Sequence, residues 1–128
     1  MINKKLKILV VEDDMIIQMF ISKTIKMGGD EVIGEARNSS EVLHFVKNCK
    51  PDLILMDIGI SGEIDGIETA KLLNKSYCIP LIFVTGNSDE STIERAKKTN
   101  PVDILFKPID ESKLKDNLTK FKAKYLHK

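Results

Sequence analysis

The sequence predicts an α/β fold, a doubly wound parallel sheet with helices on both faces. Two observations support this prediction. Short apolar runs alternate with amphipathic stretches along the chain, and this alternation is typical of repeated strand–helix–strand units with right-handed crossovers. Three of the runs, ILVV, LILM and LIFV, are continuously apolar, as expected of parallel strands that helices cover on both sides.

The apolar runs predict the strands of the sheet. The expected strands are Lys7–Val11, Glu31–Ala36, Leu53–Asp57, Leu81–Thr85 and Asp103–Phe106. Three of them follow closely on a proline, at Pro51, Pro80 and Pro101. Because proline cannot extend a preceding helix, these residues separate each helix from the next strand.

The amphipathic stretches between the runs predict the helices. They are expected at Met15–Met27, Ser40–Asn48, Ile67–Asn74, Asp89–Thr99 and Glu111–Tyr125. A Gly-Gly pair terminates the first helix, and Ser39 or Ser40 is expected to cap the second. Asp89 and Asp110 are expected to cap the fourth and fifth helices.

Size and composition indicate one globular domain over residues 1–128, with its core at about 6–125. Hydrophobic residues make up 42% of the chain and charged residues 30%, which is ordinary for such a domain. The formal net charge of +1 gives no electrostatic reason to expect direct binding to nucleic acid. Met15, Met19 and Met27 are expected to pack against the domain rather than to form a groove for a partner.

Neither export nor membrane insertion is indicated. The apolar run Ile8–Val11 is too short for the core of a signal peptide or for a membrane span. Cys49 and Cys78 form no CxxC motif or Cys/His cluster, so we expect reduced thiols and no structural metal site. The chain is therefore predicted to be a cytoplasmic protein that does not bind membranes.

Reactive side chains stand at the carboxyl ends of the predicted strands. They are Glu12, Asp13, Asp14, Asp57, Thr85 and Lys107. In a doubly wound sheet, sites form at this edge. Carboxylates that converge there repel one another, and a divalent cation relieves the repulsion. An oxygen-only ligand set favours Mg²⁺ or Mn²⁺ over zinc.

This set of side chains suits phosphoryl transfer to a carboxylate, which attacks phosphorus to form an acyl phosphate. The metal and Lys107 neutralise the phosphoryl oxygens, Thr85 binds one of them, and Gly86 leaves room for backbone contact. Taken singly, Asp13 or Asp14 would more often cap the first helix, and Lys107 would be solvated. The complete set therefore carries the prediction.

The segments ILVVEDD, LILMD, LIFVTG and LFKP resemble, in this order, the receiver domain of bacterial and archaeal response regulators. The resemblance covers essentially the whole chain. It implies a flavodoxin-like sheet of order 2-1-3-4-5 with five helices. It also implies that Asp57 is phosphorylated, that Thr85 and Lys107 contact the phosphoryl group, and that the Lys107–Pro108 bond is cis.

The resemblance also implies a cofactor and partners. The expected Mg²⁺ ligands are Asp13, Glu12 mainly through water, Asp57 and the backbone carbonyl of Gly59. The phosphoryl donor would be a histidine kinase or a phosphotransfer protein, and a downstream protein would receive the signal. The chain would be a monomer or a weak phosphorylation-dependent dimer, and not an enzyme beyond its own phosphorylation and dephosphorylation. It would be either a stand-alone regulator or part of a longer protein such as a hybrid kinase.

This sequence departs from the family pattern at three places. Ile60-Ser61 replaces the usual Met-Pro pair, and the segment Gly59–Gly66 is one residue longer than common. Ile104 stands where relatives often have an aromatic switch residue. We therefore expect the switch to lie in the Gly86–Glu90 loop, whose residues suit backbone rearrangement. Asn87, two residues after Thr85, is expected to flank the path of the hydrolytic water, as Gly59 does.

Two other functions fit the fold less well. A phosphatase of the haloacid dehalogenase type needs a second carboxylate two residues after the nucleophile, where Gly59 stands. A flavodoxin-type nucleotide-binding module needs a hydroxyl- or glycine-rich loop after the first strand. The acidic residues Glu12, Asp13 and Asp14 in that loop would repel a phosphate.

Overall fold

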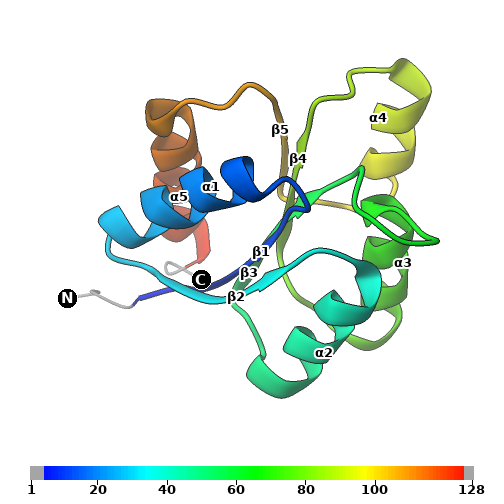
Figure 1. The fold of residues 1–128 in the computed structure, drawn as a ribbon, viewed down its shortest axis with the longest axis horizontal. Helices are drawn as coiled ribbons and strands as arrows, with labels where there is room; N and C mark the ends of the chain where they lie inside the picture. Colours follow the sequence, from blue (N-terminus) through cyan, green and yellow to red (C-terminus); the bar gives the residue numbers. More distant parts are fainter. Residues whose placement is uncertain (1–4, 126–128) are drawn as a thin grey trace.

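The computed structural model describes residues 5–125, which form one parallel sheet between two layers of helices (Figure 1). The strands lie in the order β2-β1-β3-β4-β5. The predicted fold class and strand order are therefore confirmed. The outermost residues of the predicted domain, 1–4 and 126–128, lie outside the described part of the chain.

All strands begin and end at the predicted residues. They are β1 (Lys7–Val11), β2 (Glu31–Ala36), β3 (Leu53–Asp57), β4 (Leu81–Thr85) and β5 (Asp103–Phe106). The central strands β3 and β4 are buried along their whole length, because helices cover both of their faces. β2 and β5 form the edges of the sheet and are more exposed.

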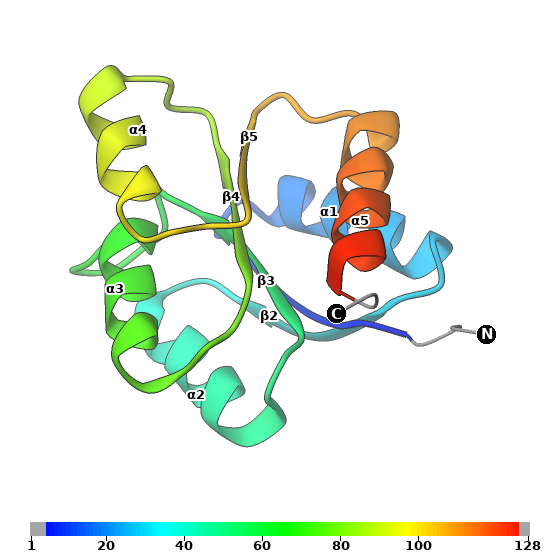
Figure 2. The same cartoon turned by 180° about the vertical axis from the view of Figure 1, so that it is seen from behind.

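Helices cover both faces of the sheet. They are α1 (Met15–Met27), α2 (Ser39–Cys49), α3 (Gly66–Ser76), α4 (Glu90–Lys97) and α5 (Glu111–Tyr125). α1 and α5 lie on one face, and α2, α3 and α4 lie on the other (Figures 1 and 2). Within residues 5–125, no helix has the length and apolar character needed to cross a membrane.

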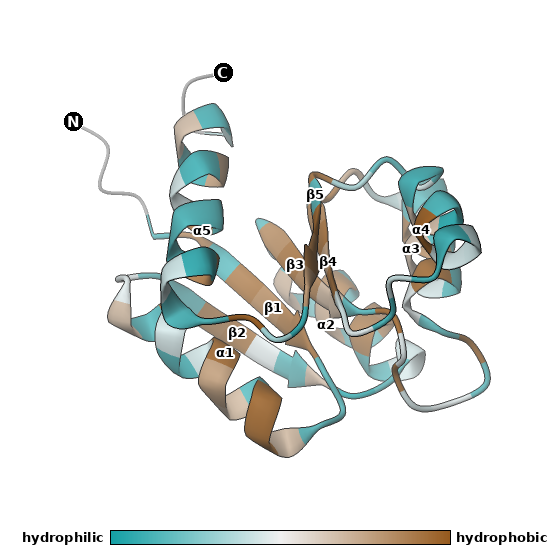
Figure 3. Ribbon diagram, turned by 90° about the horizontal axis from the view of Figure 1, so that it is seen from above, coloured by the Kyte–Doolittle hydropathy of each residue, from teal (hydrophilic) through white to brown (hydrophobic). Residues whose placement is uncertain are grey.

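Successive residues of the inner strands point into two separate apolar layers. Leu9, Ile54 and Phe83 pack with the α2–α4 layer. Their neighbours Ile8 and Leu55 pack with α1 and α5. Figure 3 shows the apolar strands enclosed between the two helix layers. The ends of β1, β3 and β4 are thereby held in register, and the residues that follow them meet at one edge.

The start of α2 differs from the prediction. Asn38, rather than Ser39 or Ser40, caps this helix, and its side chain accepts a 2.9 Å hydrogen bond from the Glu41 amide. Asn38 has extended backbone and forms an isolated parallel bridge with Ser61. This tertiary contact keeps Asn38 outside the helix, so that α2 begins one residue earlier than predicted.

Two other helices also differ in length from the prediction. α3 begins at Gly66 and runs to Ser76, because Asp65 caps it by accepting from the Glu68 amide. α4 is shorter than expected and excludes Asp89 and Thr99. Asp89 is its cap, as the sequence also indicated, while the chain leaves the helix after Lys97 in a turn. The Asp110 cap of α5 is present as predicted, accepting from the Lys113 amide at 2.7 Å.

The methionines of α1 do not pack as predicted. Met15, Met19 and Met27 are 67%, 62% and 58% exposed. α1 packs on the sheet through its other face, where Ile21 and Ile25 are buried. The prediction was wrong because the helix is apolar on more than one side, and the sequence alone does not tell which side faces the core.

Candidate functional site

Three carboxylates converge at the carboxyl edge of the sheet. Glu12 and Asp13 directly follow β1, and Asp57 is the last residue of β3, which pairs with β1. One oxygen from each carboxylate lies within 4.8 Å of the others. Glu12 and Asp57 are only 2% and 7% exposed, and Asp13 is half-buried. The structure therefore brings together the acidic residues that the sequence selected, apart from Asp14.

Asp14 has a different role. Its Oδ1 accepts hydrogen bonds from the amides of Ile16 (3.0 Å) and Ile17 (3.1 Å), which caps α1. Its own amide donates to Oε2 of Glu12 at 3.1 Å. Asp14 therefore starts the helix and orients Glu12, and its carboxylate is turned to the helix amides.

Lys107 supplies the positive charge of the site. Its Nζ donates to Oε1 of Glu12 at 2.7 Å and to Oδ2 of Asp57 at 3.3 Å. Its backbone amide donates to the Thr85 carbonyl at 2.8 Å, which aligns the end of β5 with β4. The following Lys107–Pro108 bond is cis, as expected. The ammonium group thus contacts both buried carboxylates at once.

Burial and charge act in opposite directions in this cluster. Burial raises the pKa of Glu12 above its ordinary value, although the hydrogen bonds from Lys107 and the Asp14 amide lower it. Burial alone would lower the pKa of Lys107, but Glu12 and Asp57 outweigh this effect and raise it. Lys107 is therefore a cation at neutral pH. A divalent cation beside Glu12 would favour the ionised form of this carboxyl.

The donor set fits a hard divalent cation. Three carboxylates offer oxygen ligands close together, and no nitrogen or sulfur ligand joins them in the described part of the chain. Mg²⁺ and Mn²⁺ prefer such ligands. Gly59 follows Asp57 closely, and its amide donates to Oδ1 of Asp57 at 3.2 Å. That the carbonyl of Gly59 is a metal ligand stays a prediction.

Thr85 ends β4 beside this cluster, and its side chain is buried. Its Oγ1 accepts a 3.0 Å hydrogen bond from the Asn87 amide, so its own hydroxyl hydrogen remains available to a ligand. A Cβ added at Gly86 would meet Lys107 Cδ only at 3.9 Å, which is ordinary contact distance. Gly86 is also exposed, so its backbone is accessible to a ligand.

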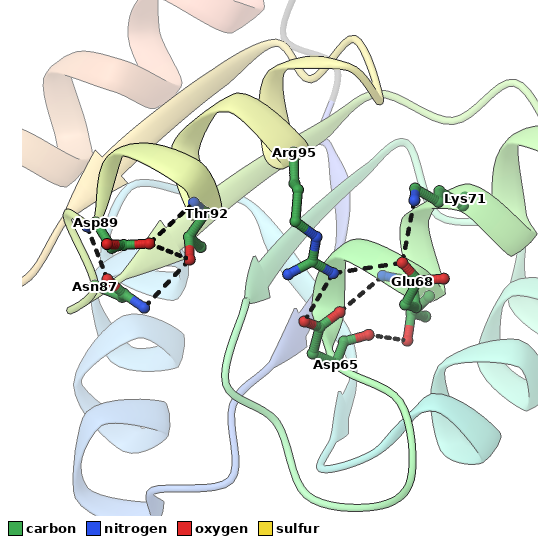
Figure 4. Close-up of polar contacts among 8 residues, drawn as sticks. Asp65, Glu68, Lys71, Asn87, Asp89, Thr92 and Arg95 are labelled. Carbon is green, nitrogen blue, oxygen red and sulfur yellow. Dashed lines mark hydrogen bonds and ion pairs between the residues drawn. The ribbon is translucent and has the colours of Figure 1, made fainter.

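The side chain of Asn87 is turned into the start of α4 (Figure 4). Its Oδ1 accepts from the Asp89 amide at 2.8 Å, and its Nδ2 lies 3.5 Å from Oγ1 of Thr92. Asp89 in turn accepts from the amide and hydroxyl of Thr92. These bonds connect Thr85 to the first turn of α4. They occupy both polar ends of the Asn87 side chain.

Ion pairs tie the other end of α4 to α3. Arg95 Nη2 lies 3.2 Å from Oδ2 of Asp65 and 3.4 Å from Oε2 of Glu68, which also pairs with Lys71 (Figure 4). Ile104 on β5 is partly buried against the α2–α4 apolar layer. α4 is therefore anchored near its C-terminal end, while its first turn depends on the loop that follows Thr85.

Sequence reasoning missed the roles of two residues in the β3–α3 loop. In the sequence Ser61 stands out only as a departure from the family pattern, yet its hydroxyl donates to Oδ2 of Asp13 at 2.7 Å. In the sequence Gly66 stands out only as the end of the loop, yet it begins α3 and its amide donates to the Ile58 carbonyl at 2.7 Å. A Cβ at Gly66 would lie 2.2 Å from the backbone oxygen of Asp57. The Asp65-Gly66 pair, an N-cap followed by a small residue, was the available signal for this close approach.

Comparisons with known proteins agree with this geometry. The family model described as the response regulator receiver domain matches residues 8–119. The chain is 30% identical over 108 residues to the transcriptional regulatory protein PdtaR of Mycobacterium tuberculosis, covering 84% of this chain and 52% of that protein. It is 32% identical over 118 residues to the sensory transduction protein LytT of Bacillus subtilis, covering 91% and 48%.

A solved structure is similar over nearly the whole chain. It is the signal receiver domain of a modulated diguanylate cyclase from Desulfovibrio desulfuricans G20, with 30% identity and a TM-score of 0.87. The match covers 98% of this chain and 100% of that one. By contrast, this chain spans about half the length of the two curated relatives.

Proposed function

Because this chain belongs to the response regulator receiver domain family of two-component signalling, we propose that Asp57 accepts a phosphoryl group in a Mg²⁺-dependent reaction. The donor is a phosphohistidine of a histidine kinase or of a phosphotransfer protein. One observation carries this proposal. Asp57 is a buried carboxylate that shares one ammonium group, that of Lys107, with Glu12 and lies against a second acidic residue, Asp13.

Each residue of the site has a separate role in the proposed phosphoryl transfer. The carboxylate of Asp57 attacks phosphorus, the phosphorus–nitrogen bond breaks, and the imidazole of the donor leaves with the electron pair. Lys107 already contacts Oδ2 of Asp57 and neutralises charge on the phosphoryl oxygens, while Thr85 donates its hydroxyl hydrogen to one of them. Glu12 and Asp13 would hold the cation, which supplies further charge neutralisation when bound.

The surface next to the site suits a protein donor. A groove beside Lys107 and Pro108 is lined mostly by apolar residues of α1, among them Ile16, Ile17 and Phe20. Ile16 is 80% exposed, and Phe20 also lines a neighbouring hollow together with Met19 and Met27. A donor that buries this surface brings its phosphohistidine to the edge of the sheet where Asp57 lies. We propose that the partner contacts this surface through apolar side chains.

The proposed role is regulatory. The domain would act in the cytoplasm on a downstream protein through its surface, without binding nucleic acid itself, as a monomer or as a weak phosphorylation-dependent dimer. It would catalyse only its own phosphorylation and dephosphorylation. A haloacid dehalogenase-type phosphatase is disfavoured, because Gly59 supplies no acid/base carboxylate two residues after Asp57.

The test is phosphorylation by a small-molecule donor. The protein is incubated with acetyl phosphate, with and without Mg²⁺, and its intact mass is measured. We expect one phosphoryl group per chain, stable in acid and labile in base, which forms only when Mg²⁺ is present. Continuous turnover of the donor without a labelled protein would support the phosphatase instead. An unlabelled protein without turnover would contradict both.

Substitution of Asn87 is expected to change dephosphorylation more than phosphorylation. Asn87 stands two residues after Thr85, a position expected to flank the path of the hydrolytic water and not of the donor, and its side-chain bonds to Asp89 and Thr92 hold the loop there. Asn87→Ala and the control Ser91→Ala, a few residues along the chain, are phosphorylated with acetyl phosphate, and label gain and loss are followed separately. Equal effects of Asn87→Ala on the two rates would contradict this role.

The response to phosphorylation is expected to centre on residues 85–90. Attraction of Thr85 toward the phosphoryl group disturbs its bond from the Asn87 amide and the first turn of α4, whereas Arg95 anchors the other end of that helix. Amide chemical shifts, measured with and without beryllofluoride, should change most at residues 85–90. Ile104→Ala should lower the free energy of unfolding, because it removes part of a packed side chain. The shift changes at residues 85–90 should be largely retained in this variant. If the amide shifts of the loop do not change and the changes are confined to β5, this account of the switch is refuted.

A further inference from the structure

Lys107 and backbone amides hold two of the three carboxylates of the site, and a side-chain hydroxyl holds the third. Glu12 accepts from Lys107 and from the Asp14 amide, and Asp57 accepts from Lys107 and from the Gly59 amide. Asp13 lacks such a partner. Within residues 5–125, the donor to its carboxylate is the hydroxyl of Ser61, at 2.7 Å from Oδ2.

Ser61 is itself held in place by the loop around it. Ile60, the preceding residue, is buried in the α2–α4 apolar layer. Ser61 forms a parallel backbone bridge with Asn38, which is fixed as the N-cap of α2. Gly62 follows with a φ of +106°, a conformation that favours glycine. The hydroxyl is therefore presented to Asp13 by a chain that is anchored through the burial of Ile60 and through the backbone bridge of Ser61.

We propose that Ser61 is a positioning residue for the divalent cation, because it fixes the carboxylate of Asp13 in one orientation. This inference rests on the proposed function, in which Asp13 is a metal ligand. A half-buried carboxylate otherwise loses rotational freedom when it binds a cation, and a hydrogen bond that orients it beforehand reduces this loss.

The hydrogen bond leaves Asp13 able to bind a cation. An ionised carboxylate has two oxygens with about four acceptor sites, and Ser61 uses one of those on Oδ2. Oδ1 and the remaining site on Oδ2 stay available. The hydrogen bond from Ser61 thus orients Asp13 without preventing it from binding the cation.

The experiment is a Mg²⁺ titration followed by amide chemical shifts, with the full chain in the absence of any phosphoryl donor. The wild type is compared with Ser61→Ala, which removes the hydroxyl, and with Ser61→Thr, which keeps it. Ser91→Ala is the matched control, because Ser91 donates a similar exposed bond to Asp89, at 2.6 Å, outside the acidic cluster.

Ser61→Ala is expected to weaken Mg²⁺ binding about fivefold, less than the loss of a buried partner of a metal ligand would. Ser61→Thr and Ser91→Ala should bind within about twofold of the wild type. Thermal unfolding without Mg²⁺ is measured for each variant. If Ser61→Ala unfolds near the wild-type temperature but binds Mg²⁺ more weakly, Ser61 positions Asp13. A general role in stabilising the loop would instead lower the unfolding temperature.

Each other result overturns the inference in a distinct way. If the wild type shows no saturable Mg²⁺ binding, the metal role in the proposed function fails as well. If the wild type binds and Ser61→Ala binds equally well or more tightly, the positioning role fails while the proposed function stands. If Ser61→Thr binds as weakly as Ser61→Ala, or if Ser61→Ala is destabilised without Mg²⁺, Ser61 only stabilises the loop.

Discussion

Asp57→Asn is expected to abolish phosphoryl incorporation from acetyl phosphate or from a phosphorylated kinase. The asparagine side chain has nearly the same shape, but its neutral amide is not a nucleophile toward phosphorus. Its single carbonyl oxygen can keep one of the two contacts of Asp57, with Lys107 or with the Gly59 amide, but its amide nitrogen cannot accept the other. The measurement is the intact mass after incubation with Mg²⁺.

Two matched variants test the assignment of roles among the acidic residues. Asp13→Asn should slow phosphorylation by weakening the cation site. Asp14→Asn should matter less, because asparagine also caps helices well and Asp14 accepts from the α1 amides. Labelling of Asp57→Asn at the wild-type stoichiometry would refute the choice of acceptor. Equal losses for Asp13→Asn and Asp14→Asn would refute their division of roles.

Gly66→Ala is expected to lower the free energy of unfolding by about 1–3 kcal/mol, the usual cost of overpacking. The new Cβ would lie 2.2 Å from the backbone oxygen of Asp57 and 3.0 Å from Cα of Ile58. Both are backbone atoms, so relief requires a shift of the start of α3 or of the β3 end that carries Asp57, the proposed phosphoacceptor. The helix propensity of alanine favours the variant, but by at most about 1 kcal/mol. Steric overlap therefore dominates.

Gly59→Ala is the control for Gly66→Ala. A Cβ at Gly59 meets no atom within 4 Å, so this variant should unfold at nearly the wild-type urea concentration. Urea unfolding is measured for both variants, together with the rate of phosphorylation by acetyl phosphate for Gly66→Ala. We expect that rate to fall, because Asp57 moves with its backbone. Equal stability of the two variants would mean that the approach of α3 to β3 is looser than the structure indicates.

The sheet was predictable from the sequence because its signals are local. The apolar runs of β1, β3 and β4 occupy the centre of the sheet, and proline stands shortly before β3, β4 and β5. The ends of helices were less predictable where contacts with a distant segment of the chain determine them. Asn38 caps α2 because its extended backbone pairs with Ser61, a contact between residues far apart in the chain.

The sequence alone indicated that Glu12, Asp13, Asp57 and Lys107 lie together, since the carboxyl ends of parallel strands must meet at one edge of the sheet. Glu12, Asp57 and Lys107 are within hydrogen-bonding reach there because β1, β3 and β5 are held in register. Only the tertiary structure decided how the β3–α3 loop closes over this edge. Ser61 reaches Asp13 because Ile60 is buried in the core, and Gly66 must be small because α3 starts against the backbone of β3. Such contacts depend on distances between segments, which the order of residues along the chain does not specify.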